Sequence, residues 1–394
     1  MGEAVQEHIG GSPIRSHLAL YHRAIANPFR YSSPVDPEDM IDRQPEVDQV
    51  LALADGAHNT RLVAPRRYGK TSLLRAVAQR AETLGLIPVY VNFFGVVTAA
   101  DISERIELAY SEQLRGPLAG WFDGVRATLR LGSGPIPASV ELADARAQEP
   151  LLERLALPRR VFEKHGRRCV IAFDEFQDTL TASPRIDALI RSEIEKHGDA
   201  ASYVFTGSQV GMMRELLTSR RRAFYAQARA IDLGQLAPAD VAEFVDQRFA
   251  ATGKQVGAAL EPLLAFSEGH PQRAMLLAHF VWEATPPRGE ASEVTWATTL
   301  ARVLTVEAAD ELRASWSSLR SSERRAVLAI ATGQAPYARA TQRRVGGSRG
   351  GGMEHAIRSL IDAGDLLADT RSRTGYRLAD PLLAHWVREG RGAR

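Results

Sequence analysis

Cysteine is almost absent from this chain of 394 residues, in which Cys169 is the single example. One cysteine excludes an internal disulfide and any metal site built from several thiolates. Lysine is scarce too, because only four of the 49 basic residues are lysines and the rest are arginines. We interpret this preference for arginine as the codon bias of a GC-rich genome.

Long apolar runs are also missing. The segment 169–173 is typical of the apolar stretches, which are far shorter than the roughly 20 residues that cross a bilayer. The first twenty residues carry acidic groups and no apolar core, so they do not resemble a secretory signal. Gln6 stands where a myristoylation motif at Gly2 would need Ser or Thr. We therefore expect a cytoplasmic protein without a membrane partner.

What is present is an ordinary globular composition, with 45% hydrophobic and 24% charged residues. The length predicts two or three domains, since single cores stop growing at about 250–300 residues. The net charge of +2 is unevenly divided, because residues 315–394 contain fourteen arginines and seven acids. That region carries +7 and the remainder −5, which suggests an anionic partner for the C-terminal part.

Short apolar segments alternate with segments of helical periodicity between residues 61 and 205. This alternation predicts an α/β fold with a parallel, doubly wound sheet and helices on both faces. Residues 125–143 are predicted to form an irregular or hairpin insertion, because residue types alternate along this segment and it contains glycine and proline. The predicted strands are 61–63, 87–94, 168–173 and 201–205, and the predicted helices include 101–114, 151–164 and 186–197.

A phosphate-binding loop follows the first predicted strand. Residues 64–71 read APRRYGKT, the pattern G-x-x-x-x-G-K-[ST] with Ala64 in place of the first glycine. Gly69 would let backbone N–H groups face a β-phosphate, Lys70 would reach the β- and γ-phosphates, and Thr71 would ligate Mg²⁺. Ala64 costs little if its φ is negative, and roughly 1 kcal/mol or more if φ is positive.

Polar residues at the ends of two later strands complete the candidate site. Asp174 and Glu175 follow the strand at 168–173, and we expect them at the tip of a strand next to the phosphate loop. Asp174 would hold the Mg²⁺ shell and Glu175 would polarise the attacking water as general base. Thr206 and Ser208 would reach the same edge of the sheet and contact the γ-phosphate or the water. A plain strand-to-helix turn explains the latter two equally well.

Seven short segments extend the pattern along nearly the whole chain. They are NPF (27–29), IDRQPE (41–46), APRRYGKTSLL (64–74), FDEFQ (173–177), TGSQVGMM (206–213), GHPQRAMLLA (269–278) and DPLLAHWVR (380–388). In this order they resemble the archaeal-type ATPases, also found in bacteria, of the STAND class, which are related to the AAA+ ATPases. The chain departs from the family at Ala64 and around residues 125–150.

The resemblance implies a P-loop NTPase fold of the AAA+ type with a helical lid and a C-terminal winged helix-turn-helix domain. Its cofactors would be ATP or ADP with Mg²⁺. The implied domains are an N-terminal arm (1–26), an ATPase core (27–232), a lid (233–312) and a winged-helix domain (313–394). The implied nucleotide contacts are Ile41, Arg43, Ala64, Pro65, Arg66, Arg67, Tyr68, Gly69, Lys70, Thr71, Ser72 and Pro271.

Two arginines have roles that only the resemblance implies. Arg273 lies where the family carries a second sensor, so it would sense the γ-phosphate; the alternative is a solvated arginine at a helix start. Arg229 would act as an arginine finger across the subunit interface of a homo-oligomer. Residues 220–222, all arginines, compete for that role.

The basic C-terminal region can be interpreted without the family. Helices predicted at 322–330, near 340–345 and at 353–363, followed by strands at 366–369 and 376–379, match a winged helix. Its third helix would enter a DNA major groove while an arginine-rich wing touches phosphate. Winged helices also serve as lids and protein docks, so a protein partner remains open. The candidate DNA contacts are Arg343, Arg344, Arg349, Arg358, Arg371 and Arg373.

These observations predict an ATP-binding and ATP-hydrolysing switch that couples nucleotide state to binding of double-stranded DNA. The alternative is a signalling or scaffold ATPase whose basic domain holds a protein and no nucleic acid. A third hypothesis is a degenerate site, in which Ala64 leaves a nucleotide binder that hardly turns over.

Overall fold

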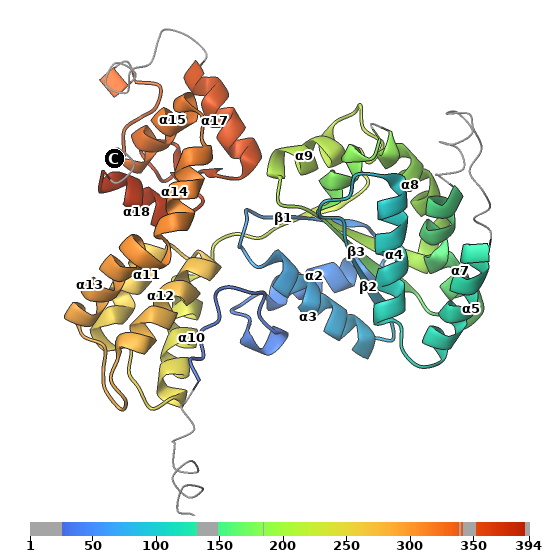
Figure 1. Ribbon diagram of the computed structural model, residues 1–394, viewed down its shortest axis with the longest axis horizontal. Helices are drawn as coiled ribbons and strands as arrows, with labels where there is room; N and C mark the ends of the chain where they lie inside the picture. Colours follow the sequence, from blue (N-terminus) through green and yellow to red (C-terminus); the bar gives the residue numbers. More distant parts are fainter. Residues whose placement is uncertain (1–25, 132–148, 184, 339, 342–351, 391–394) are drawn as a thin grey trace, which may run out of the picture.

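The computed structural model describes residues 26–131, 149–183, 185–338, 340–341 and 352–390. Figure 1 shows two lobes that meet near the middle of the molecule. We call residues 44–232, which contain the large sheet, the sheet lobe, and residues 238–390, which are mainly helical, the helical lobe. Among the described helices, none is long and apolar enough to cross a membrane.

Five parallel strands form the sheet, in the order β2-β3-β4-β1-β5. The predicted parallel sheet is therefore confirmed. One expectation is wrong: the strand that carries Asp174 is not next to the strand before the phosphate loop, because β4 pairs with both. The strands are β1 (Thr60–Val63), β2 (Ile87–Asn92), β3 (Cys169–Asp174), β4 (Ala201–Thr206) and β5 (Arg229–Asp232).

Helices cover both faces of this sheet. Successive residues of each strand point to opposite faces, and apolar residues on both faces are buried under these helices. In β3, Cys169, Ile171 and Phe173 pack on one face, and Val170 and Ala172 pack on the other. Figure 1 shows the two helical layers. The first face packs against α4 (Ala99–Gln113), α5 (Pro117–Leu131), α7 (Leu157–His165), α8 (Ile186–Ile194) and α9 (Val210–Thr218), and the second against α2 (Gln44–Asp55) and α3 (Lys70–Thr83).

Two local predictions fail in the sheet lobe. The segment from 125 to 131 was expected to be irregular or a hairpin, and it is the end of α5; residues 132–148 lie outside the described chain. Trp121, Phe122 and Val125 pack into the core from this helix, so its apolar period is helical. The strand β5 was not predicted, because only Ile231 is buried in it and no apolar run marks it.

The helical lobe has one continuous hydrophobic core. Phe249, Leu277, Val327, Leu360 and Trp386, from five different helices, belong to a single buried cluster. The predicted lid and winged helix therefore pack as one body. Its elements are α10 (Pro238–Ala251), α11 (Leu260–Ser267), α12 (Pro271–Ala284), α13 (Glu293–Arg302), α14 (Ala309–Ser318), α15 (Ser321–Ala331), α17 (Gly352–Ala363), β6 (Leu366–Ala368), β7 (Tyr376–Leu378) and α18 (Pro381–Arg388).

One contact between the two lobes lies where α17 meets α9. Arg214 of α9 places Nη1 3.3 Å from Oδ1 of Asp362 on α17. Gly211 approaches so closely that a Cβ added there would lie 2.4 Å from the Cβ of Asp362. The helix that was predicted to enter a DNA groove is therefore partly covered by the sheet lobe.

Candidate functional site

The phosphate loop lies between β1 and α3, as predicted, and its backbone explains its sequence. Gly69 has φ +90°, which is a left-handed conformation that favours glycine, and Arg67 has φ +66°. Ala64 is not among the described residues with positive φ. The alanine therefore replaces the first glycine of the motif at little conformational cost.

Lys70 is buried at the first turn of α3 and points back across the loop. Its Nζ donates hydrogen bonds to the carbonyl oxygens of Ala64 and Pro65, each at 3.1 Å. Burial lowers the pKa of the Lys70 ammonium, and the carboxylate of Asp174 opposes that shift. The loop thus holds a cation among backbone groups at a helix N-terminus, which is an arrangement suited to anionic phosphate.

A cavity of about 690 Å³ opens beside this loop, and both lobes contribute to its lining. This volume lies in the range of small-molecule sites. The predicted site residues that line it are Ile41, Arg43, Arg66, Arg67, Tyr68, Gly69, Lys70, Thr71, Ser72, Asp174, Glu175, Ser208 and Pro271. Ala64, Pro65, Thr206, Arg229 and Arg273, which were also predicted, are not part of this lining.

One wall of the cavity comes from the segment 30–41, which crosses from the helical lobe to the sheet lobe. The side chain of Phe29 is buried in the helical core, whereas the Val35 N–H donates to Ser72 Oγ at 3.1 Å in the sheet lobe. Arg43 then donates to the Gly234 carbonyl at 2.6 Å, beside the connection between the lobes. Because most of this segment has no hydrophobic periodicity, the sequence predicts only a loop there.

Other lining residues were missed as well. Phe94 follows β2 and is 70% exposed, Leu236 lies just before α10, and Gln272 and Met275 belong to the first turns of α12. Glu311 of α14 also reaches the cavity. For these residues the sequence contains one signal of a place in the site: Gln272 and Met275 belong to the segment GHPQRAMLLA, which also contains Pro271.

Asp174 and Glu175 lie side by side at the end of β3, and both line the cavity. Asp174 is 5% exposed, and burial raises its pKa. Glu175 has a left-handed backbone with φ +51°. Burial would raise the pKa of Glu175, but hydrogen bonds from Gln177 and Ser208 hold it below the usual value. Glu175 is thus an ionised acceptor at neutral pH.

Ser208 and Thr206 differ in their surroundings, although Thr206 is the last residue of β4 and Ser208 follows two residues later. Ser208 donates to Glu175 Oε2 from its backbone N–H at 3.0 Å and from its Oγ at 2.9 Å. Thr206 is fully buried, and its Oγ1 has no hydrogen-bond partner among the described residues. Of these two residues, Ser208 therefore contacts a carboxylate of the candidate site and Thr206 does not.

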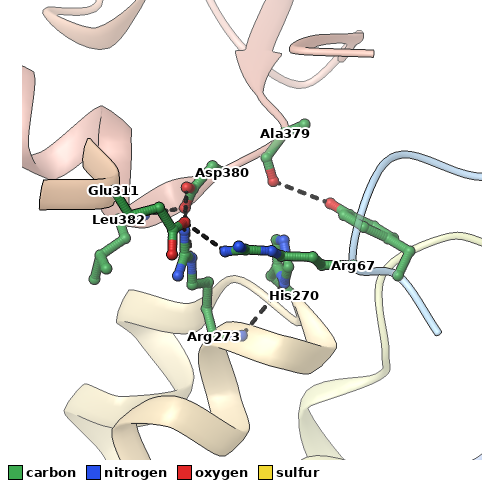
Figure 2. Close-up of polar contacts among 8 residues, drawn as sticks. Arg67, His270, Arg273, Glu311, Ala379, Asp380 and Leu382 are labelled. Carbon is green, nitrogen blue, oxygen red and sulfur yellow. Dashed lines mark hydrogen bonds and ion pairs between the residues drawn. The ribbon is translucent and has the colours of Figure 1, made fainter. Parts of the chain in front are cut away.

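Arg273 does not line the cavity itself. It is 1% exposed and forms ion pairs with Asp380, before α18, and with Glu311, at 2.6 Å from each. Arg67 of the phosphate loop also binds Glu311, so this carboxylate receives one arginine from each lobe. Figure 2 shows Arg67 and Arg273 pointing toward Glu311, with Asp380 beside Arg273.

Aromatic and backbone contacts strengthen the same junction. Tyr68 of the phosphate loop packs on His270, with ring centroids 4.7 Å apart, and donates to the Ala379 carbonyl at 3.3 Å. A second cavity of about 260 Å³ lies against Arg66, Arg67, Arg273 and Asp380. The phosphate loop, α12 and the C-terminal region thus meet at one point.

Arg229 and the phosphate loop lie at opposite ends of the strands of the sheet. It pairs with Thr60 at the start of β1, whereas the loop follows Val63, and its side chain is exposed. It therefore does not face the cavity of its own chain. Its role as a finger between subunits stays a prediction.

Three of the predicted DNA contacts can be placed. Arg358 on α17 is exposed and pairs with Glu354 at 3.0 Å, and Arg371 and Arg373 are exposed on the turn between β6 and β7. Arg343, Arg344 and Arg349 lie outside the described residues.

A metal ion held by the described residues would need further ligands from water or substrate. In the described part of the chain, no group of three or more His, Cys, Asp or Glu side chains could hold a metal ion. Thr71 and Asp174 nevertheless line the same cavity and offer oxygen ligands, which Mg²⁺ prefers. Because Mg²⁺ usually keeps several waters and binds substrate phosphates, two protein oxygens fit it.

Comparison with known proteins extends the description of the fold. No protein-family model matches the sequence, and no curated protein matches it. A Walker-type ATPase of Pyrococcus abyssi superimposes with a TM-score of 0.66 at 18% identity, over 92% of this chain and 99% of that one. The Aeropyrum pernix ORC2 protein, in ADPNP and ADP complexes, gives a TM-score of 0.58 at 15% identity, over 92% and 98%. The chain therefore has the P-loop AAA+ ATPase fold, as the sequence predicted.

Proposed function

We propose that this protein is an ATP-binding and ATP-hydrolysing switch, in which nucleotide in the first cavity controls how the helical lobe sits on the sheet lobe. The observation that carries this proposal is Glu311, which lines that cavity and binds both Arg67 of the phosphate loop and Arg273 of α12. A change at the phosphates would therefore act directly on a contact between lobes. The Aeropyrum pernix ORC2 protein forms complexes with ADPNP and ADP, which supports ATP and ADP as ligands of the similar fold found here.

The residues of the cavity divide into nucleotide-binding roles. Residues 66–72 would bind phosphates, with Lys70 exchanging its two carbonyl partners for phosphate oxygens. Ile41, Arg43 and Pro271 would surround the base and sugar. Thr71 and Asp174 would hold Mg²⁺, which supplies positive charge against the developing charge on the phosphates when it is bound.

Hydrolysis requires a base beside the terminal phosphate, and Glu175 is our candidate. Its ionised carboxylate would accept the proton of the attacking water. In this structure Ser208 and Gln177 occupy that carboxylate, so Glu175 would have to leave them, at least in part, to act. Thr206 would serve as a further sensor residue, since its hydroxyl has no hydrogen-bond partner among the described residues.

Arg273 and Arg229 would act only after a rearrangement. Arg273 would have to exchange Asp380 and Glu311 for a γ-phosphate, and Arg229 would need a neighbouring subunit. The domain boundaries that we propose are the arm at 1–26, the ATPase core at 27–232, the lid at 233–312 and the winged helix at 313–394. This division follows the family resemblance to STAND ATPases.

Hydrolysis is tested by comparing the intact protein with Lys70→Ala and Glu175→Gln. We expect Lys70→Ala to weaken ATP binding at least tenfold. We expect Glu175→Gln to keep binding and to slow turnover by 10²–10⁴-fold, which is the usual contribution of a general base. Lys164→Ala and Glu163→Gln are the matched controls, because both residues lie in the last turn of α7 and neither lines the cavity. Equal rates for all five proteins would refute the ATPase, and binding without turnover would favour the degenerate site.

The second part of the proposal is that the C-terminal region binds double-stranded DNA. Exposed Arg358, Arg371 and Arg373 and the charge of +7 over residues 315–394 support it. The alternative partner is a protein, and the packing of α17 on α9 supports that alternative because a helix partly covered by the sheet lobe is less accessible to a DNA groove.

Anisotropy of a labelled random duplex separates the two partners. We expect binding that weakens with salt and differs between a slowly hydrolysed ATP analogue and ADP. Arg371→Glu with Arg373→Glu should lower the salt slope by about two phosphate contacts. Arg105→Glu with Arg185→Glu, exposed in the sheet lobe, is the control for net charge. No binding in either nucleotide state would favour the protein partner.

A further inference from the structure

Tyr90 lies on β2 and touches the acidic end of β3. Its hydroxyl donates a hydrogen bond to Asp174 Oδ2 at 2.7 Å. The register pairs Tyr90 with Ala172 and Asn92 with Asp174, so Tyr90 and Asp174 share one face of the sheet. Ala172, directly opposite Tyr90, is small, which leaves the ring room to reach diagonally along the neighbouring strand to the carboxylate.

The backbone of Tyr90 is fixed by a side chain instead of a strand. Because β2 is at the edge of the sheet that the described residues form, the outward N–H and C=O of Tyr90 have no strand of that sheet to pair with. Gln113, at the end of α4, accepts from the Tyr90 N–H at 2.7 Å and donates to the Tyr90 carbonyl at 2.9 Å. Both outward groups are thereby satisfied, as partly buried backbone groups must be.

These contacts determine the orientation of the Asp174 carboxylate. Oδ2 accepts from Tyr90, and Oδ1 accepts from the Glu175 N–H at 3.0 Å. We propose that Tyr90 is a positioning residue that aims Asp174 at a divalent cation bound with nucleotide, and that Gln113 holds Tyr90 in place. This inference rests on the proposed function, because it assumes that Asp174 serves a cation.

The test is the Mg²⁺ dependence of the intact protein. In Tyr90→Phe, the Mg²⁺ concentration for half-maximal ATP hydrolysis should rise about tenfold, which is the scale of one hydrogen bond to a charged group. ATP binding in EDTA should stay at the wild-type affinity. Tyr110→Phe is the matched control, since Tyr110 is buried in the same lobe and its hydroxyl has no hydrogen-bond partner among the described residues.

A second variant separates positioning from simple packing. Gln113→Ala should shift the Mg²⁺ midpoint in the same direction, and the double variant with Tyr90→Phe should shift it no further, because both act through one contact. If Tyr90→Phe folds poorly, Gln113→Ala tests the same series of contacts. A Mg²⁺-dependent wild type with unchanged midpoints in both variants would overturn the role of Tyr90 alone. A wild type that binds and hydrolyses ATP without regard to Mg²⁺ would overturn the proposed metal site, and the role of Tyr90 with it.

Discussion

Arg273 binds Asp380 through two hydrogen bonds, from Nε to Oδ1 at 2.9 Å and from Nη2 to Oδ2 at 2.6 Å. The guanidinium is buried, and two planar groups bonded in this way have a fixed mutual orientation. Asp380 also caps α18 by accepting from the Leu382 N–H at 2.9 Å. One carboxylate thus fixes both the N-terminus of α18 and the side chain of Arg273, which also binds Glu311.

Asp380→Asn should separate these two functions. Asparagine retains the cap but removes the charge, which leaves buried Arg273 with Glu311 as its remaining anionic partner. Breaking a buried pair from one side costs on the order of 3 kcal/mol, and the partial exposure of Asp380 lowers that figure. We expect a clear fall in the melting temperature. Asp310→Asn, at an exposed ion pair nearby, should leave it almost unchanged, and equal melting curves for the two variants would contradict the argument.

The sequence predicted the parts of the site that depend on local pattern. The phosphate loop, the acids at the end of β3 and the parallel strands follow from motif and periodicity within a few residues. The order of strands is set by pairing between distant segments, which is why the insertion of β4 beside β1 was missed. The two partners of Arg273, Asp380 and Glu311, lie 107 and 38 residues away, so the burial of Arg273 could not be deduced from its place at a helix start. Residues 30–41, which form one wall of the first cavity, have no hydrophobic periodicity from which their position could be predicted.

Gly211→Ala should force the two lobes apart at α9. A Cβ at this position would lie 2.4 Å from Asp362 Cβ and 2.9 Å from its Cα, so α17 would have to move. We expect a larger radius of gyration in X-ray scattering. If α17 enters a DNA groove, duplex affinity should rise as well.

Gly120→Ala is the matched control for that experiment, because a Cβ at Gly120 meets nothing within 4 Å on the exposed side of α5. It should leave the shape unchanged and stabilise the helix by about 0.5–1 kcal/mol. Identical scattering curves for both variants would mean that the lobes are held by contacts other than this one.

Exchange between alanine and glycine should have different consequences at the two ends of the phosphate loop. Ala64→Gly should not accelerate ATP hydrolysis, since the φ of Ala64 needs no glycine, and it should cost about 0.4–1 kcal/mol of stability through the unfolded chain. Gly69→Ala must place a Cβ at φ +90°, which costs roughly 1–2 kcal/mol and distorts the phosphate-facing amides. Nucleotide affinity and melting temperature measure both effects. Faster turnover in Ala64→Gly would instead support the degenerate site.

His270 should make the junction sensitive to acid. It is 3% exposed, its Nδ1 accepts from the Arg273 N–H at 3.3 Å, and burial lowers its pKa to about 4. The unfolded histidine takes up its proton near pH 6.5. Between these values the unfolded chain binds more protons, so stability is lost as the pH falls.

At pH 5 this loss amounts to roughly 2 kcal/mol, at about 1.4 kcal/mol per pKa unit. His270→Asn keeps a side chain that can cap α12 and removes the titration, so its melting temperature should fall less between pH 7 and pH 5. Some slope should remain, because burial also lowers the pKa of His197 to about 4. His58→Asn, at an exposed position, is the control. A His270→Asn profile parallel to that of the wild type would show that His270 does not couple this junction to pH.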